Sequence, residues 1–403
     1  MRMPHGYQKP GTILRVNKAL YSLRISPLLW QKEFTSTLKI LGFQSILHEP
    51  CCMIRDGIII FFYVDDIILA YAQAKEQEAQ QAIKQLQERY TITGGHDLHW
   101  FLGMEIIRNR SDRKVQLSQS AYTTKISQLA DKRSLRHDTL IAVAELQPHN
   151  GAVSMSDIRR YQRKIGSLLF AAVTTRPDIS FAISRLARFL MNPSEAHHDV
   201  ADRVLLYLDN TSSLSLELGG GSDLVVASDA SFADNTIDRK SSQGYTIQLF
   251  RGLIDWRANK QDTVTTSTTE AELLALSQVA KEAMFIRRLL KELRVTLPDK
   301  TITIDCDNLQ TINLVTKDAM KLQTKLRHVD IHNHWLRQEV SNGTLQVRYI
   351  PSADMPADGL TKVLPAHKWD AFLRQLNLVP SLKPRLTTID LQLEVMQDSI
   401  EAA

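Results

Sequence analysis

The feature that most constrains this chain is the apolar run Ile58–Tyr71, which Asp65 and Asp66 interrupt near its middle. The run is shorter than the roughly 20 residues that a helix needs to cross a bilayer, so it predicts no membrane span. Its β-branched and aromatic residues instead predict two short strands that meet at the acidic pair. Helical periodicity flanks them, at Leu28–Leu41 and at Lys75–Tyr90. These patterns indicate a mixed α/β layer domain.

The chain is too long for one ordinary core, since 403 residues correspond to two or three domains. Periodicity fades over residues 135–154, which predicts a linker, and residues 156–211 have helical spacing with a break at Pro177. A second α/β unit begins after the glycines at 219–221. We therefore expect an α/β domain at 1–150, a helical connecting segment at 151–220, a second α/β domain at 221–379 and a weakly ordered tail at 380–403.

Composition excludes some classes of protein and suggests a class of partner. Lys and Arg number 49 against 44 Asp and Glu, which gives a net charge of +5. This mild excess suits a polyanionic partner, but it fits an ordinary basic protein equally well. Three cysteines make neither a disulfide framework nor a zinc site, and the N-terminus has no secretory pattern. We expect an intracellular protein, cytoplasmic or nuclear, without a membrane anchor.

Asp65 and Asp66 are the first candidate metal ligands. Neighbouring side chains on a strand point to opposite faces, so only a tight turn lets both carboxylates approach one ion. Burying them without a cation is unfavourable because desolvation and mutual repulsion oppose ionisation, and Mg²⁺ would remove that penalty. The alternative is a solvated hairpin turn.

Four further acids stand at the ends of expected elements: Asp229 after a strand that starts at Leu224, Glu270 in the first turn of a helix, Asp307 after the strand at 301–304, and Asp358 at a helix start. Each has a structural explanation by itself. Asp229 fits a turn, Asp307 fits a helix cap, and Glu270 and Asp358 are favourable near a helix N-terminus.

The motifs around the first acidic pair resemble those of a known family. Tyr63-Val64-Asp65-Asp66 is similar to the YxDD signature of reverse transcriptases, whose paired aspartates bind the metals for nucleotide addition. The surroundings resemble the copia-type retrotransposon polyproteins more closely, through the segments Lys18-Ala19-Leu20-Tyr21, Trp30, Gly42-Phe43 and Phe101-Leu102-Gly103-Met104-Glu105-Ile106. The segment from Tyr161 to Phe170 and the motif Thr175-Arg176-Pro177-Asp178 are similar to the connection between polymerase and nuclease in that family. Arg176 is expected either to face a nucleic-acid backbone or to be solvated.

The acids of the second domain resemble those of RNase H. The similarity includes Arg239-Lys240-Ser241, Gly244-Tyr245, Thr268-Thr269-Glu270-Ala271-Glu272 and His328-Val329-Asp330-Ile331. It implies that Asp229, Glu270, Asp307 and Asp358 hold two Mg²⁺ ions that flank a scissile phosphate, with Glu272 and Asp305 as neighbours and not ligands. His328, His332 and His334 have helical spacing and are expected to be ordinary helix residues.

Taken together, the resemblance implies the α/β (α+β) class, with a partial reverse-transcriptase palm, a helical connector and an RNase H-like mixed β-sheet flanked by helices. It implies Mg²⁺-dependent hydrolysis of RNA in RNA:DNA hybrids, within a larger polyprotein.

Three departures affect this expectation. A further catalytic aspartate of the family lies upstream of Lys18 and is absent here, and Arg24-Ile25 replaces a family Lys-Gln pair, so we expect polymerisation by this chain to be lost. No histidine lies between His334 and His367, where many retroviral RNases H have one. An inert copy that only folds or binds nucleic acid is the alternative, and an unrelated metal-dependent phosphotransferase is a third, weaker one.

Overall fold

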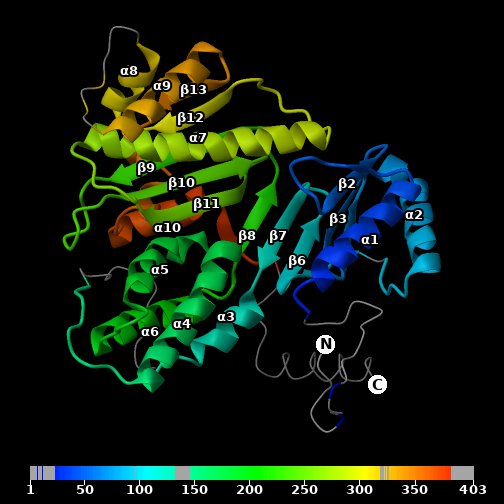
Figure 1. The fold of residues 1–403 in the computed structure, drawn as a ribbon, viewed down its shortest axis with the longest axis horizontal. Helices are drawn as coiled ribbons and strands as arrows, with labels where there is room; N and C mark the ends of the chain where they lie inside the picture. Colours follow the sequence, from blue (N-terminus) through cyan, green and yellow to red (C-terminus); the bar gives the residue numbers. More distant parts are fainter. Residues whose placement is uncertain are drawn as a thin grey trace. The chain divides into compact units, whose positions relative to one another are not determined.

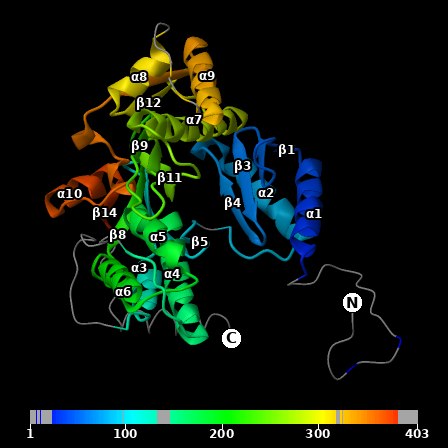
Figure 2. The same ribbon diagram turned by 60° about the vertical axis from the view of Figure 1, so that its left-hand side comes forward.

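The computed structural model describes residues 23–95, 97–131, 146–317 and 326–382, with single positions 7, 11, 322 and 324 (Figures 1 and 2). The chain divides into two compact units. Unit 1 is Met1–Leu98 with Phe285–Thr296, and unit 2 is His99–Met284 with Leu297–Ala403. The Lys18–Tyr21 motif, much of the expected linker and residues 383–403 lie outside the described residues.

Unit 1 is a four-stranded antiparallel sheet with helices. Its elements are α1 (Ser26–Ile40), β1 (Gln44–Ser45), β2 (Cys52–Arg55), β3 (Ile58–Tyr63), β4 (Asp66–Ala70), η1 (Gln73–Lys75) and α2 (Glu76–Arg89), and the strand order is β1-β2-β3-β4. Alternate residues of β3, Ile58, Ile60 and Phe62, are buried against Phe34 and Leu38 of α1. The expected strand pair and both flanking helices are confirmed.

One layer of unit 2 combines strands that are distant in sequence. The sheet order is β14-β8-β7-β6-β5, formed by β5 (Trp100–Phe101), β6 (Met104–Asn109), β7 (Lys114–Ser118), β8 (Leu214–Gly219) and β14 (Leu378–Pro380). The accompanying helices are α3 (Ser120–Ser127), α4 (Met155–Thr174), η2 (Pro177–Ile179), α5 (Ser180–Leu186), η3 (Ala187–Phe189) and α6 (Glu195–Asn210). The break expected at Pro177 is confirmed, because η2 begins there.

The second sheet of unit 2 has the mixed order β11-β10-β9-β12-β13. Its strands are β9 (Leu224–Ser231), β10 (Ser242–Leu249), β11 (Gly252–Lys260), β12 (Ile302–Cys306) and β13 (Leu345–Tyr349). The remaining elements are α7 (Thr268–Glu292), α8 (Leu309–Thr316), α9 (Arg327–Ser341), η4 (Ser352–Asp354), η5 (Asp358–Leu360) and α10 (Ala366–Gln375), and α7 runs along this sheet (Figure 1). Strand β9 is antiparallel to β10 and parallel to β12. A mixed β-sheet flanked by helices is the architecture that the resemblance implied for this part of the chain.

No helix among the described residues is both long enough and apolar enough to cross a membrane.

Arg176 lies in a buried ion-pair network and not at a surface. Its guanidinium donates to Asp178 at 3.0 and 2.7 Å and to the carbonyl oxygen of Thr211 at 3.2 Å. The Tyr207 hydroxyl donates to the same Asp178 carboxylate at 2.6 Å. Neither a nucleic-acid contact nor a solvated arginine fits this environment, so both expectations for Arg176 were wrong. The local sequence motif shows that Arg176 is charged, but it does not show the distant residues Tyr207 and Thr211 that surround it.

Removing the acid of this network tests its contribution to stability. Asp178→Ala leaves the Arg176 charge buried without its carboxylate, so we expect the free energy of unfolding to fall by about 3–5 kcal/mol. Denaturant titration measures this loss. The matched control is Asp370→Ala, which removes an exposed carboxylate of α10 and should leave the midpoint unchanged. Equal midpoints for the two variants would contradict a structural role for the network.

Candidate metal centre

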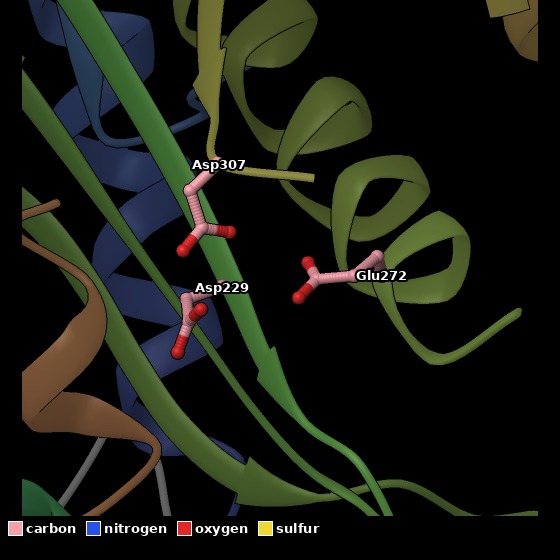
Figure 3. Close-up of side chains that lie close together, drawn as sticks. All are labelled: Asp229, Glu272 and Asp307. Atoms are coloured by element: carbon pink, nitrogen blue, oxygen red, sulfur yellow. The ribbon is translucent and has the colours of Figure 1, made fainter. Parts of the chain in front are cut away.

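Three carboxylates from distant parts of unit 2 converge at the centre of the mixed sheet. Asp229 lies in β9, Asp307 follows β12, and Glu272 lies in α7. One ligand oxygen of each lies within 4.8 Å of the others. Because β9 and β12 are parallel neighbours, their carboxyl ends bring Asp229 and Asp307 to the same edge. Glu272 extends from the helix toward both aspartates (Figure 3).

The glutamate of this cluster is Glu272 and not Glu270, which differs from the sequence-based expectation. Residues two apart on a helix point about 200° apart, so only one of the two can face the strands. Glu270 instead accepts hydrogen bonds from the backbone and hydroxyl of Thr266, at 2.7 and 2.9 Å. The Ser267 hydroxyl accepts from the Glu270 backbone at 3.2 Å. Glu270 therefore completes the helix N-terminus, which was the structural explanation available from sequence.

Two sequence signals could have distinguished these glutamates. Ser267 and Glu270 have the S-x-x-E spacing of a capping box. Glu272 instead shares the helical spacing of Ala275, Leu276 and Val279, which are all buried. A glutamate in the middle of a buried helical face needs a reason to be there, and a metal site supplies one.

Asp358 lies beside the cluster but is not one of its three members. It begins η5 and forms an ion pair with Lys362 one turn later. Thr361, from the same segment, donates its hydroxyl hydrogen bond to Asp229. Asp305, expected to be a neighbour, is bound by Arg348 of the adjacent strand at 2.7 and 3.0 Å.

Burial and repulsion from neighbouring carboxylates raise the pKa values of Asp229 and Glu272. Burial raises the pKa of Asp229 to about 6, with further increases from Asp358 and Asp307, although Lys362 and Thr361 oppose the shift. Burial, Asp229 and Asp307 raise the pKa of Glu272 well above its ordinary value. The pKa of Lys362 is also raised. Burial lowers its pKa, but the carboxylates of Asp229, Asp358 and Asp307 outweigh that effect and raise it.

The donor set fits a hard divalent cation. All three converging groups offer carboxylate oxygens, which Mg²⁺ prefers to nitrogen or sulfur. Glu272 Oε2 is buried and has no hydrogen-bond partner among the described residues. A buried acceptor without a donor is unfavourable unless a cation approaches it, so these residues suit a metal ion.

The acidic pair of unit 1 occupies a different environment. Tyr63 pairs with Asp66 across the hairpin, so Val64 and Asp65 form the turn, and both aspartates are exposed. Val64 has φ 55°, which is strained for a β-branched residue. The indole of Trp30 donates a hydrogen bond to the Val64 carbonyl and holds this turn. Among the described residues, Asp65 and Asp66 belong to no group of three potential ligands.

The three histidines near α9 form no metal cluster among the described residues. A ring nitrogen of His332 lies 2.8 Å from the Ser277 hydroxyl, and His334 lies 3.7 Å from Asp330. Both are contacts that helix side chains commonly make.

Gly244 allows η5 to approach the sheet at this site. It pairs directly with Asp229, and a Cβ added there would lie 2.8 Å from Leu360 Cβ and 3.1 Å from Thr361 Cγ2. Any larger residue would push this segment away from Asp229.

Replacing Gly244 tests this close approach. We expect Gly244→Ala to lower the free energy of unfolding by about 1–3 kcal/mol through overpacking, and to weaken Mg²⁺ binding because Thr361 moves away from Asp229. Thermal unfolding and calorimetric metal titration measure the two effects. Gly343→Ala, at a position with no heavy atom near the added Cβ but φ 70°, controls for backbone strain alone. It should reduce stability without changing metal affinity, and an equal loss of affinity would refute the packing explanation.

The raised pKa of Asp229 predicts a pH-dependent penalty to stability. Its folded-state pKa, about 6, lies above the ordinary 3.8, so its ionisation opposes folding increasingly as pH rises between these values. A shift of this size corresponds to roughly 3 kcal/mol above pH 6. Without metal, Asp229→Asn should therefore be more stable than the parent at pH 7.5, and the difference should vanish near pH 4. Denaturant titrations in EDTA at both pH values test this, and a variant less stable at pH 7.5 would contradict it.

Comparison with known proteins identifies the family of this chain. Residues 1–136 match the family model described as reverse transcriptase (RNA-dependent DNA polymerase). The retrovirus-related Pol polyprotein from transposon TNT 1-94 of Nicotiana tabacum is 30% identical over 387 residues, which are 92% of this chain and 29% of that protein. A putative transposon Ty5-1 protein of Saccharomyces cerevisiae is 31% identical over 295 residues, covering 70% of this chain and 94% of that protein.

Among solved structures, the foamy viral protease-reverse transcriptase in complex with RNA/DNA hybrid is 14% identical, with a TM-score of 0.45, over 90% of this chain and 41% of that chain. The chain spans less than a third of the length of the tobacco polyprotein that it matches. The matched sequences nevertheless extend across both units. The chain belongs to the retrovirus-related Pol polyproteins of copia-type transposons.

Proposed function

We propose that unit 2 is a Mg²⁺-dependent ribonuclease that hydrolyses the RNA strand of RNA:DNA hybrids. The observation that carries this proposal is the convergence of Asp229, Glu272 and Asp307 within 4.8 Å at the centre of an RNase H-like sheet. Membership of a reverse-transcribing family supports the choice of substrate, since reverse transcription produces RNA paired to DNA. The 2′-hydroxyl distinguishes the RNA strand chemically.

The proposed metal ligands are Asp229, Glu272 and Asp307, with Asp358 at the margin of the site. When bound, a pair of divalent ions would supply the charge that activates a water molecule and stabilises the leaving oxygen. Glu270, which the resemblance implies as a ligand, instead forms hydrogen bonds with Thr266 and Ser267 at the N-terminus of α7.

Neighbouring side chains orient the ligands. Thr361 donates to Asp229, and the Ser352 hydroxyl donates to Asp307 at 2.6 Å, so each aspartate has one oxygen held by a neutral donor. Lys362 lies against Asp358 and partly neutralises the acids around it. Together these contacts limit the rotation of the aspartates and leave their other oxygens for a cation.

The proposed activity is confined to unit 2. Asp65 and Asp66 remain candidate ligands for a palm-type Mg²⁺ site, but no third described carboxylate joins them. We therefore propose no RNA-directed polymerisation by this chain alone. The remaining parts of a longer polyprotein are the partners that such a function would require.

Exchanging each glutamate of α7 for glutamine separates ligand from helix cap. Glu272→Gln should lower the rate of hybrid cleavage by at least about 100-fold, because it removes a charged ligand. Glu270→Gln, two residues away on the same helix, is the matched control. It should retain activity near that of the parent and lose some stability through a weakened helix end. Hydrolysis of a labelled RNA:DNA hybrid in Mg²⁺ measures both.

Metal binding distinguishes the proposed nuclease from an inert copy. Calorimetric titration of the parent with Mg²⁺ should show binding that Glu272→Gln weakens and Glu270→Gln does not. A parent that neither binds Mg²⁺ nor cleaves the hybrid would establish the inert alternative. Equal cleavage by the parent and Glu272→Gln would overturn the assignment of this cluster.

A further inference from the structure

A pocket of about 230 Å³ lies in unit 2 beside the acidic cluster, and three cations line it. Arg185 and Arg188 come from α5 and η3 of the connecting helices, and Lys362 follows η5. Phe181 and Phe189 form apolar walls, while the segment from Ser231 to Ile237 after β9 forms the remaining side. Because the connecting helices and the RNase H-like sheet both contribute, neither alone would make this pocket.

The cations of the pocket are unequally neutralised. Arg185 forms an ion pair with Asp234, and Lys362 forms one with Asp358. Arg188 instead donates to the neutral amide oxygen of Asn235, and no carboxylate of the described residues lies within ion-pair distance of it. Burial and the adjacent Arg185 lower the pKa of Arg188 to about 10, although Asp234 and Asp238 oppose the shift, and Arg188 stays cationic at neutral pH. A half-buried guanidinium that has no carboxylate in direct contact favours an additional anion beside it.

The pocket adjoins the proposed catalytic centre along one strand. Ser231, which lines it, follows Asp229 by two residues on β9, which corresponds to about 7 Å on the same face of the sheet. Lys362 lies at both places, since it lines the pocket and contacts Asp358. Consecutive phosphates of a nucleic-acid strand advance about 3.4 Å along the helix axis, so the pocket lies roughly one to three nucleotides from a phosphate bound at the acids.

We propose that this pocket binds one backbone phosphodiester of the substrate, with Arg188 as its main contact. The proposal rests on the nuclease function given above and adds a positioning site to it. The planar guanidinium presents paired donors that match phosphate oxygens. Such a contact also offsets an electrostatic repulsion, because the carboxylates of the cluster repel the phosphates of the nucleic acid that must bind there. A cation a few nucleotides away offsets that repulsion and fixes the register of the strand.

Binding measured without cleavage tests this site. Fluorescence anisotropy with a labelled RNA:DNA hybrid in EDTA should show about tenfold weaker binding by Arg188→Ala, and a salt-dependence slope smaller by about one. Arg163→Ala, which removes an exposed arginine of α4, is the matched control and should bind as the parent does. Arg188→Lys keeps the charge and should recover part of the affinity. Equal affinities for Arg188→Ala and Arg163→Ala would overturn the proposal.

A substrate series tests the same contact on the folded parent. Hybrids that carry a single neutral methylphosphonate linkage should lose affinity at one position within a few nucleotides of the cut, and Arg188→Ala should be insensitive to that substitution. The absence of any sensitive position would overturn the proposal, even if Arg188→Ala fails to fold. Binding of polyglutamate that depends on Arg188, without such dependence for the hybrid, would instead assign the pocket to a protein partner. A parent that shows the contact but does not cleave would refute the nuclease function while retaining the pocket.

Discussion

The convergence of three carboxylates near the end of β9, two of them buried and one partly exposed, is the constraint around which unit 2 is organised. Asp229, Glu272 and Asp307 repel one another in a poorly hydrated environment, and each would be more stable apart. They stay together because the sheet register and the packing of α7 hold their backbones, while Thr361 and Ser352 hold two of the carboxylates. Such an arrangement opposes folding and is understandable as a binding site, since a divalent cation converts the repulsion into attraction.

Elsewhere in unit 2, buried charges are balanced locally. Arg176 lies against Asp178, and Lys164 binds Asp131 and Asp202 within the connecting helices. Asp305, two residues from Asp307, is neutralised by Arg348. The cluster instead has an excess of acid, and in the adjacent pocket Arg188 has no described carboxylate within ion-pair distance. Uncompensated charge of both signs therefore lies along one strand end, and a metal ion together with a phosphodiester would compensate both.

The two acidic sites of the chain differ in what their surroundings do to the carboxylates. Asp65 and Asp66 occupy an exposed hairpin where water already stabilises their charge, and strain is found in the backbone at Val64. In the cluster of unit 2, the unfavourable energy comes instead from the buried carboxylate charges. Exposed carboxylates need no ion to be tolerated, so the hairpin alone is weaker evidence for a metal site than the cluster.

The sequence by itself determined the elements and most of the acids, because hydrophobic periodicity and capping are local. The strands around Asp65 and Asp66, the break at Pro177, and the placement of Asp229 near the end of β9 and Asp307 after β12 all follow from neighbours a few residues away. Tertiary structure decided which glutamate of α7 faces the sheet, why Arg176 is buried, and how Arg188 comes to lie near Lys362. The capping-box spacing of Ser267 and Glu270 and the apolar helical face around Glu272 are local signals that distinguish the two glutamates. Both side chains are buried, and only the packing of α7 against the sheet brings Glu272 beside the aspartates, because that contact joins segments tens of residues apart.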